Sequence, residues 1–311
     1  MEVYVLPGAA LPARPRVVAL GFFDGMHRGH AALFAAARQA ARERGCETAV
    51  FTFADDGSLK PGAPRLLAED ERLSLMQAQG AEAVFLYRFS AISGLSPAAF
   101  VEKILFEQLS AAAVVCGYNF RFGAGGAGDA ALLHRLLGAH HVPLITLPAQ
   151  RLGDEVISAS RIRAALAAGE AELAAHMLGR PYTVSGCVAH GKALGRTIGV
   201  PPANLPILPG RGLPAHGVYA AVGYIEGDGR PHAGVANIGV RPTVEAGAAP
   251  NCETHFLDRV GDIYGKHLTV LLLRRLRGEI TFENLEALHA QILQDAAQAK
   301  EYIATWLNGQ N

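Results

Sequence analysis

Residues 21–30 read Gly21-Phe22-Phe23-Asp24-Gly25-Met26-His27-Arg28-Gly29-His30, and the first half of the chain is organised around this decapeptide. The apolar run before it, residues 17–20, predicts a β-strand. After it, residues 30–44 are rich in alanine and place apolar residues at helical spacing, and Gly45 ends this predicted helix. A second strand is predicted over residues 48–53, so the segment reads as a βαβ unit.

Three more strands are predicted over residues 83–87, 113–116 and 144–147, with helices between them, of which residues 97–109 form the clearest. Strands interleaved with helices predict a doubly wound parallel sheet. Such sheets bind ligands at the carboxyl ends of their strands. The decapeptide and the loop after Cys116 each follow a predicted strand, so both are expected at that edge of the sheet.

The character of the sequence changes at Gly179-Arg180-Pro181, after a predicted helix over residues 160–178. We therefore expect two domains, residues 1–180 and 181–311. In the second, short β-rich runs separated by Gly, Pro and Asp predict an antiparallel barrel or sandwich. These runs are residues 182–190, 217–225, 233–239, 253–258 and 268–276.

The end of the chain predicts a helix that is capped by Thr281. Apolar side chains recur along it at helical spacing, and this face is expected to lie against the barrel. They are Phe282, Leu285, Leu288, Ile292 and Ala296.

The chain of 311 residues has 28 basic and 28 acidic side chains, so its formal net charge is zero. This balance gives no reason to expect nucleic-acid or membrane binding, and no obligatory protein partner is evident. We expect a cytoplasmic protein, because the N-terminus lacks a signal peptide and no apolar run is long enough to cross a bilayer. The cysteines form no CxxC pair and are expected to be reduced thiols: Cys46, Cys116, Cys187 and Cys252.

The two histidines of the decapeptide suit phosphate chemistry. A site that transfers a phosphate-containing group needs hydrogen-bond donors where negative charge develops. His27 and His30 flank Gly29 where the predicted helix begins, and both a helix N-terminus and an imidazole favour a phosphate. Two other interpretations are a tight turn with incidental histidines and a metal pair, although no cysteine or carboxylate stands nearby at a familiar zinc spacing.

The decapeptide resembles the signature of the bacterial bifunctional riboflavin kinase and FAD synthetase family, whose N-terminal domain belongs to the HxGH nucleotidylyltransferases. The resemblance implies that this domain is an FMN adenylyltransferase, with His27 and His30 as catalytic residues. It also implies substrate or nucleotide contacts at Gly21, Phe22, Phe23, Asp24, Gly25 and Gly29.

Two later segments are similar to the same family. The glycine-rich loop of residues 117–123 implies contacts through Asn119 and Phe122; taken alone it would be an ordinary flexible loop. Residues 157–163 carry hydroxyls and an arginine at a predicted helix start, which implies polyphosphate contacts at Ser158, Ser160 and Arg163, or else a plain N-cap. The chain departs from the family at Ala159, where a second hydroxyl is usual, and at residues 53–56, where an aspartate and Pro-His-Pro are frequent.

The second half resembles riboflavin kinases over residues 186–205, 237–243, 253–258 and 262–265. The resemblance assigns the catalytic base to Glu253, which taken alone would be an exposed strand carboxylate, and Mg²⁺ and nucleotide contact to Asn204. It implies further nucleotide or substrate contacts at Gly191, Lys192, Arg196, Gly199, Arg241 and Thr243.

Pro202 is a departure from that pattern, because the family reads Pro-Thr-Ala-Asn where this chain reads Pro201-Pro202-Ala203-Asn204. Proline has no side-chain oxygen for Mg²⁺ and no N–H. Three hypotheses follow, all with riboflavin, FMN and ATP as small-molecule substrates. The chain makes FMN and then FAD with ATP as co-substrate, or it is an FMN adenylyltransferase with a weak or inactive kinase, or it is a catalytically silent flavin-binding protein.

Overall fold

The computed structural model describes residues 1–55, 64–189, 202–207, 210–240, 250–258 and 260–309. It divides into two compact units, Met1–Ala159 and Ser160–Asn311. The division drawn from the sequence, after residue 180, differs because two helices that precede that point pack with the barrel. These helices are α6 (Ala159–Ala168) and α7 (Ala171–Leu178). The Leu166 carbonyl accepts from the Ala215 N–H, and Glu172 accepts a hydrogen bond from Tyr302.

The first unit contains a six-stranded parallel sheet in the order β1-β4-β3-β2-β5-β8, which confirms the predicted doubly wound fold. Five strands match the predicted ones to within two residues at each end, whereas β1, at one edge, was not predicted. Their bounds are β1 (Glu2–Leu6), β2 (Arg16–Leu20), β3 (Glu47–Phe53), β4 (Ala83–Tyr87), β5 (Ala111–Gly117) and β8 (Leu144–Leu147).

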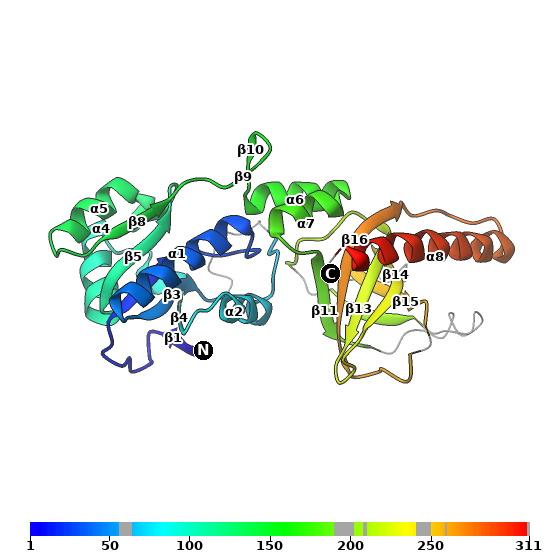
Figure 1. The fold of residues 1–311 in the computed structure, drawn as a ribbon, viewed down its shortest axis with the longest axis horizontal. Helices are drawn as coiled ribbons and strands as arrows, with labels where there is room; N and C mark the ends of the chain where they lie inside the picture. The colour runs from blue at the N-terminus through cyan, green and yellow to red at the C-terminus, as the bar shows by residue number, and fades with distance from the viewer. Residues whose placement is uncertain (56–63, 190–201, 208–209, 241–249, 259, 310–311) are drawn as a thin grey trace. The chain divides into compact units, whose positions relative to one another are not determined.

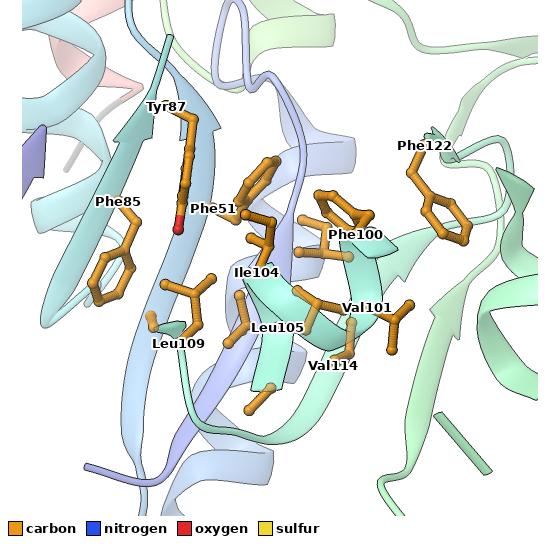
Figure 2. Close-up of a cluster of buried hydrophobic side chains, with 14 of the residues drawn as sticks. Phe51, Phe85, Tyr87, Phe100, Val101, Ile104, Leu105, Leu109, Val114 and Phe122 are labelled. Atoms are coloured by element: carbon orange, nitrogen blue, oxygen red, sulfur yellow. The ribbon is translucent and has the colours of Figure 1, made fainter. Parts of the chain in front are cut away.

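Two buried clusters, one on each face of the sheet, form the core of this unit. Helices α1 (Arg28–Arg44) and α2 (Glu69–Ala78) cover one face, with Phe34 and Met76 fully buried against β2, β3 and β4. Figure 2 shows the other cluster, in which aromatic rings of β3 and β4 meet aliphatic side chains of residues 100–109. Both faces of the sheet are thus covered, as parallel sheets require.

The clearest predicted helix of this unit, residues 97–109, has a different form. It begins as a short α-helical turn, α4 (Pro97–Ala99), and continues as a π-helix, η1 (Phe100–Gln108). The predicted helix over residues 160–178 is in fact the two helices α6 and α7, which are separated at Gly169, where φ is +82°. The remaining short elements are α3 (Phe89–Ile92), β6 (Arg121–Phe122), η2 (Ala124–Gly126), β7 (Gly128–Asp129), α5 (Ala130–Gly138), β9 (Arg151–Leu152) and β10 (Glu155–Val156).

The second unit is an antiparallel barrel of six strands in the order β11-β16-β13-β14-β15-β12. A bridge between Ala189, just after β11, and Asn204 on β12 joins the two ends, so the sheet is a nearly closed barrel rather than a sandwich. Strand β12 was not predicted. The strands are β11 (Tyr182–Cys187), β12 (Ala203–Pro206), β13 (Gly217–Ile225), β14 (Pro231–Val240), β15 (Pro250–Phe256) and β16 (His267–Arg277).

The last helix, α8 (Leu285–Asn308), packs along β13 and β14, as Figure 1 shows. The expectation that Thr281 caps it was wrong: the cap is Asn284, whose side chain accepts from the Ala287 N–H at 2.8 Å. The helix buries Ala299 and Ile303 against the barrel, and of the predicted apolar face Leu288, Ile292 and Ala296 are half-buried. No helix in the described part of the chain is both long and apolar enough to span a membrane.

A buried ion pair fastens α8 to the barrel. The Arg277 guanidinium donates to both oxygens of Asp295, with its Nη2 at 2.7 Å from Oδ2, and Asp295 is only 3% exposed. We expect Asp295→Ala to lower the free energy of unfolding by about 3 kcal/mol, because it leaves the arginine charge without its buried partner. Urea unfolding measures this loss. Glu301→Ala, at an exposed position of the same helix, is the control and should change it by less than about 0.5 kcal/mol.

Candidate active sites

The decapeptide and the glycine-rich loop both begin at the point where the strand order of the sheet reverses. Strand β2 leads through α1 to β3 on one side, and it pairs with β5 on the other. The decapeptide follows β2 and the loop of residues 117–123 follows β5, so the two segments leave neighbouring strands at their carboxyl ends. Ligands of doubly wound folds bind at this reversal point.

The decapeptide begins with a tight turn whose backbone is unusual. Phe23, Gly25 and Met26 have φ values of +60°, +79° and +42°, and the Met26 N–H donates to the Phe23 carbonyl at 3.3 Å. The Phe23 ring is buried against Phe34 at 5.1 Å between ring centroids. A Cβ on Gly21 would lie 2.8 Å from that ring, which explains the glycine there. Non-glycine residues at positive φ are strained, and such strain is common at functional sites.

His27 and His30 lie together at the start of α1. His27 is the N-cap, and its Nδ1 accepts from the His30 N–H at 3.4 Å. The two rings stack with centroids 3.6 Å apart, and the edge of His30 meets Phe23. A Cβ on Gly29 would lie 3.0 Å from the His27 ring, so glycine lets this ring fold over the helix end. Because Nδ1 accepts, a neutral His27 carries its proton on Nε2.

Asp24 and Phe22 tie the decapeptide to more distant parts of the chain. Asp24 is 4% exposed, and its Oδ1 accepts from the Leu66 N–H at 2.9 Å. The Phe22 ring lies beneath two guanidinium groups, with Arg65 at 4.4 Å and Arg72 at 4.9 Å from its centroid. Sequence reasoning missed both arginines, because they stand more than forty residues away in a stretch without a motif. Their placement depends on the packing of α2 against the sheet.

The two contact residues predicted in the loop after β5 have different surroundings. Asn119 is exposed in a turn closed by the Phe120 N–H and the Gly117 carbonyl, so its side chain can reach a ligand. The Phe122 ring is instead 5% exposed and packs between Phe100 and Phe120. Phe122 therefore supports the loop from within the core.

Aromatic side chains missed by the sequence analysis also follow the strand ends. Phe53 ends β3 and contacts Phe89, which follows β4, at 5.5 Å between centroids. Phe89 and Tyr118 are 39% and 51% exposed, an unusual position for such large apolar rings. Flat exposed rings at this edge could stack on a planar ligand.

The third predicted motif lies at the start of α6. Ser158 immediately precedes the helix, while Ser160 and Arg163 belong to its first turns. The boundary between the two compact units falls between Ser158 and Ser160, so the motif is shared by both.

In the barrel, the structure brings together the two residues predicted for kinase chemistry. Glu253 on β15 lies directly opposite Asn204 on β12 and Asn237 on β14, and side chains at opposite positions share a face. Asn251, two residues before Glu253, donates to Asn204 Oδ1 at 3.3 Å and to Glu253 Oε1 at 3.2 Å. Asn204 donates in turn to the Pro202 carbonyl at 3.1 Å. We call Asn204, Asn251 and Glu253 the barrel polar cluster.

His255, two residues beyond Glu253, is a neighbour of this cluster on the same strand. Burial lowers its pKa, and the nearby Glu253 carboxylate opposes that effect only in part. His255 is therefore expected to be neutral at physiological pH. The other face of β15 is buried in the barrel, where burial raises the pKa of Cys252 to about 12. That thiol is a packing residue, and all four cysteines are unpaired.

The barrel polar cluster fits a magnesium ion held jointly with a nucleotide. Amide and carboxylate oxygens are hard ligands of the kind that Mg²⁺ binds, and it commonly takes only one or two from a protein and the rest from phosphates and water. No group of three or more His, Cys, Asp or Glu side chains in the described residues could hold a metal alone. The other predicted residues of this half lie outside the described residues: Gly191, Lys192, Arg196, Gly199, Arg241 and Thr243.

The fold and the geometry of its sites define the class: a doubly wound nucleotide-binding domain of the HxGH type, followed by a β-barrel with a polar cluster on its strands. The FAD synthetase family model matches residues 11–161, and the riboflavin kinase model matches residues 178–303. The chain belongs to the bifunctional riboflavin kinase/FMN adenylyltransferase family.

Relatives with that description match nearly the whole chain. The Escherichia coli K12 protein is 36% identical over 296 residues, covering 94% of both chains, and the Listeria monocytogenes protein is 34% identical and covers 93% of both. A crystal structure described as a macrolide-efflux protein from Streptococcus pneumoniae is 29% identical, with a TM-score of 0.86, covering 96% of this chain and 99% of that one. The two-domain architecture is therefore shared along its full length.

Proposed function

We propose that the chain converts riboflavin to FMN in the barrel and FMN to FAD in the parallel-sheet domain, with ATP as co-substrate of both steps. The observation that carries the second reaction is the pair His27 and His30 at the reversal point of the sheet. The observation that carries the first is the barrel polar cluster. The small-molecule substrates are riboflavin, FMN and ATP, and we expect the chain to work in the cytoplasm.

In the adenylyl transfer, a phosphate oxygen of FMN attacks the α-phosphorus of ATP, and the bond to the pyrophosphate oxygen breaks. The attacking phosphate is already anionic at neutral pH, so this step needs no general base. His27 and His30 donate hydrogen bonds to phosphate oxygens at the N-terminus of α1, whose dipole also favours the charge. Catalysis is then positioning with charge stabilisation.

The rest of this site recognises the two substrates. Exposed Asn119 contacts the nucleotide or the flavin phosphate from the neighbouring loop. Ser158, Ser160 and Arg163 contact the polyphosphate. Phe89 and Tyr118 offer exposed rings on which the flavin ring system can stack. Gly21, Gly25 and Gly29 act through the backbone, and Phe23 and Asp24 act by holding the turn, since both side chains are buried.

In the kinase reaction, Glu253 accepts the proton of the riboflavin 5'-hydroxyl as its oxygen attacks the γ-phosphorus of ATP, and ADP leaves. Asn251 fixes the position of the Glu253 carboxylate. Mg²⁺, held by Asn204 and the nucleotide, would neutralise the phosphate charge when bound. Gly191, Lys192, Arg196, Gly199, Arg241 and Thr243 are proposed to contact the nucleotide or riboflavin.

One assay tests both steps. The purified chain is incubated with ATP, Mg²⁺ and either riboflavin or FMN, and the flavins are separated by chromatography. FAD from both substrates supports the bifunctional enzyme, whereas FAD from FMN alone supports an adenylyltransferase with an inactive kinase. Flavin binding without any product would favour the silent binding protein and contradict the proposal.

Pro202 gives a test of how the kinase site holds its metal. Its carbonyl orients the Asn204 amide, but it offers no side-chain oxygen. We expect Pro202→Thr to raise the kcat for FMN formation several-fold, by adding a hydroxyl ligand and an N–H. Pro206→Thr, at the far end of β12, is the control. An unchanged rate at every Mg²⁺ concentration would mean that other groups hold the metal.

A further inference from the structure

A buried arginine lies behind the decapeptide at the carboxyl ends of two strands. Arg72 of α2 is 3% exposed. Its Nη1 donates to the Phe22 carbonyl at 2.9 Å and to Thr52 Oγ1 at 3.3 Å, and its Nη2 donates to the Phe53 carbonyl at 2.6 Å. One guanidinium thus joins the segment that follows β2 to the end of β3.

The Phe22 carbonyl is held from two sides. Besides Arg72, the hydroxyl of Thr52 donates to it at 3.0 Å, and Thr52 is fully buried. This carbonyl belongs to the peptide that enters the strained turn at Phe23, so its direction sets the path of the residues up to His27. The hydrogen bond from the charged Arg72 and the buried one from Thr52 can together offset the free-energy cost of the strained backbone at Phe23.

Given the adenylyl transfer proposed above, on which this step rests, we infer that Arg72 is a positioning residue for that reaction. It holds the Phe22 carbonyl so that the turn presents His27 and His30 to the phosphates. It also places a positive charge behind the phosphate-binding turn. This positioning role is distinct from any contribution that Arg72 makes to the free energy of unfolding.

The charge of Arg72 is balanced locally. Glu69 lies 3.6 Å from Nη2, on the same helix. Burial lowers the pKa of Arg72, while Glu69, Asp24 and Asp55 oppose that change. A guanidinium remains protonated under such conditions, so the positive charge persists.

Arg16 is a matched control within the same strand system. It is fully buried at the amino end of β2, where its Nε donates to Glu47 at 2.7 Å and its Nη atoms donate to the carbonyls of Leu109 and Pro12. Arg16 and Arg72 are therefore alike: each is buried, donates hydrogen bonds to two backbone carbonyls and lies beside a glutamate. They differ in which end of the sheet they occupy, and ligands bind at the carboxyl end only.

The test compares kcat/KM for ATP in FAD formation from FMN, and the thermal unfolding midpoint, in the full chain. We expect Arg72→Met to lower kcat/KM at least tenfold. Arg72→Lys should lose less than Arg72→Met, because an ammonium keeps the positive charge but has one nitrogen where the guanidinium uses two to reach the Phe22 and Phe53 carbonyls. Arg16→Met should lower the unfolding midpoint as Arg72→Met does, yet stay within threefold in kcat/KM.

Equal losses of kcat/KM in Arg16→Met and Arg72→Met would overturn the inference, because stability alone would then explain them. If Arg72→Met does not fold, Thr52→Val decides: it removes the other donor to Phe22 without changing shape, and a three- to tenfold loss is expected. Full activity of Thr52→Val would count against the role of this carbonyl. A wild-type chain that makes no FAD would instead contradict the proposed function.

Discussion

His30→Ala is expected to remove nearly all FAD formation from FMN, with a loss of about 10²–10³-fold in kcat, the usual effect of removing one donor to a developing oxyanion. The ring stacks on His27 and is only partly buried, so its removal leaves the N-cap of α1 in place. Riboflavin binding in the barrel should remain intact. Chromatography of the flavins after incubation with FMN, ATP and Mg²⁺ measures the loss.

His27 needs a different substitution, because it caps α1 and is also proposed to bind the phosphates. Asparagine is a favoured N-cap, so His27→Asn keeps an acceptor for the His30 N–H while removing the imidazole. We expect a folded chain with the same defect in FAD formation. His134→Ala, at an exposed position on α5, is the control and should have full activity. Undiminished FAD production by His30→Ala would refute the assignment of this site.

Glu253→Gln is expected to remove FMN formation from riboflavin, with a loss of about 10²–10⁴-fold, the range of general-base catalysis. Glutamine keeps the Oε1 that accepts from Asn251, so the barrel polar cluster should retain its geometry. Conversion of FMN to FAD should be unaffected, since His27 and His30 lie in the other compact unit. The two steps are measured separately by supplying riboflavin or FMN.

The control for this variant is Glu226→Gln. Glu226 is an exposed carboxylate at the end of β13, where it accepts from the His267 N–H at 3.1 Å. It should leave both reactions unchanged. If Glu253→Gln loses both steps together while its unfolding midpoint is unchanged, the assignment of separate sites is wrong.

The two sites differ in how directly their chemistry follows from local sequence. The conformation of the decapeptide depends on its own residues, because the absence of a Cβ at Gly29 leaves room for the His27 ring and the absence of one at Gly21 leaves room for the Phe23 ring. The barrel polar cluster has no such local unit: Asn204 and Glu253 are 49 positions apart and meet only through the pairing of β12 with β15. Strand β12 itself has four residues and was not predicted.

Hydrophobic periodicity and the positions of glycines were sufficient to predict the βαβ unit of residues 16–53, five of the six strands of the sheet and the division into a sheet and a barrel. These signals are local, since they reflect which face of each segment avoids water. They failed at Thr281, and although they located the helix of residues 97–109 they did not reveal that most of it is a π-helix. Local propensities differ little at such positions, and packing selects the form.

Long-range burial decided the rest. Nothing in the decapeptide requires β2 to pair with β5, yet that pairing brings the loop that carries Asn119 to the same edge of the sheet as the turn that ends at His30. Nothing near Arg72 in the chain marks it as a partner of the Phe22 carbonyl; α2 must first cover the sheet. The amino-acid sequence alone indicated where most of the helices and strands form and where His27 and His30 stand relative to them. The order of the strands and the partners of buried polar groups depended on the tertiary structure, because every apolar face must be buried and every buried donor must find an acceptor in the same fold.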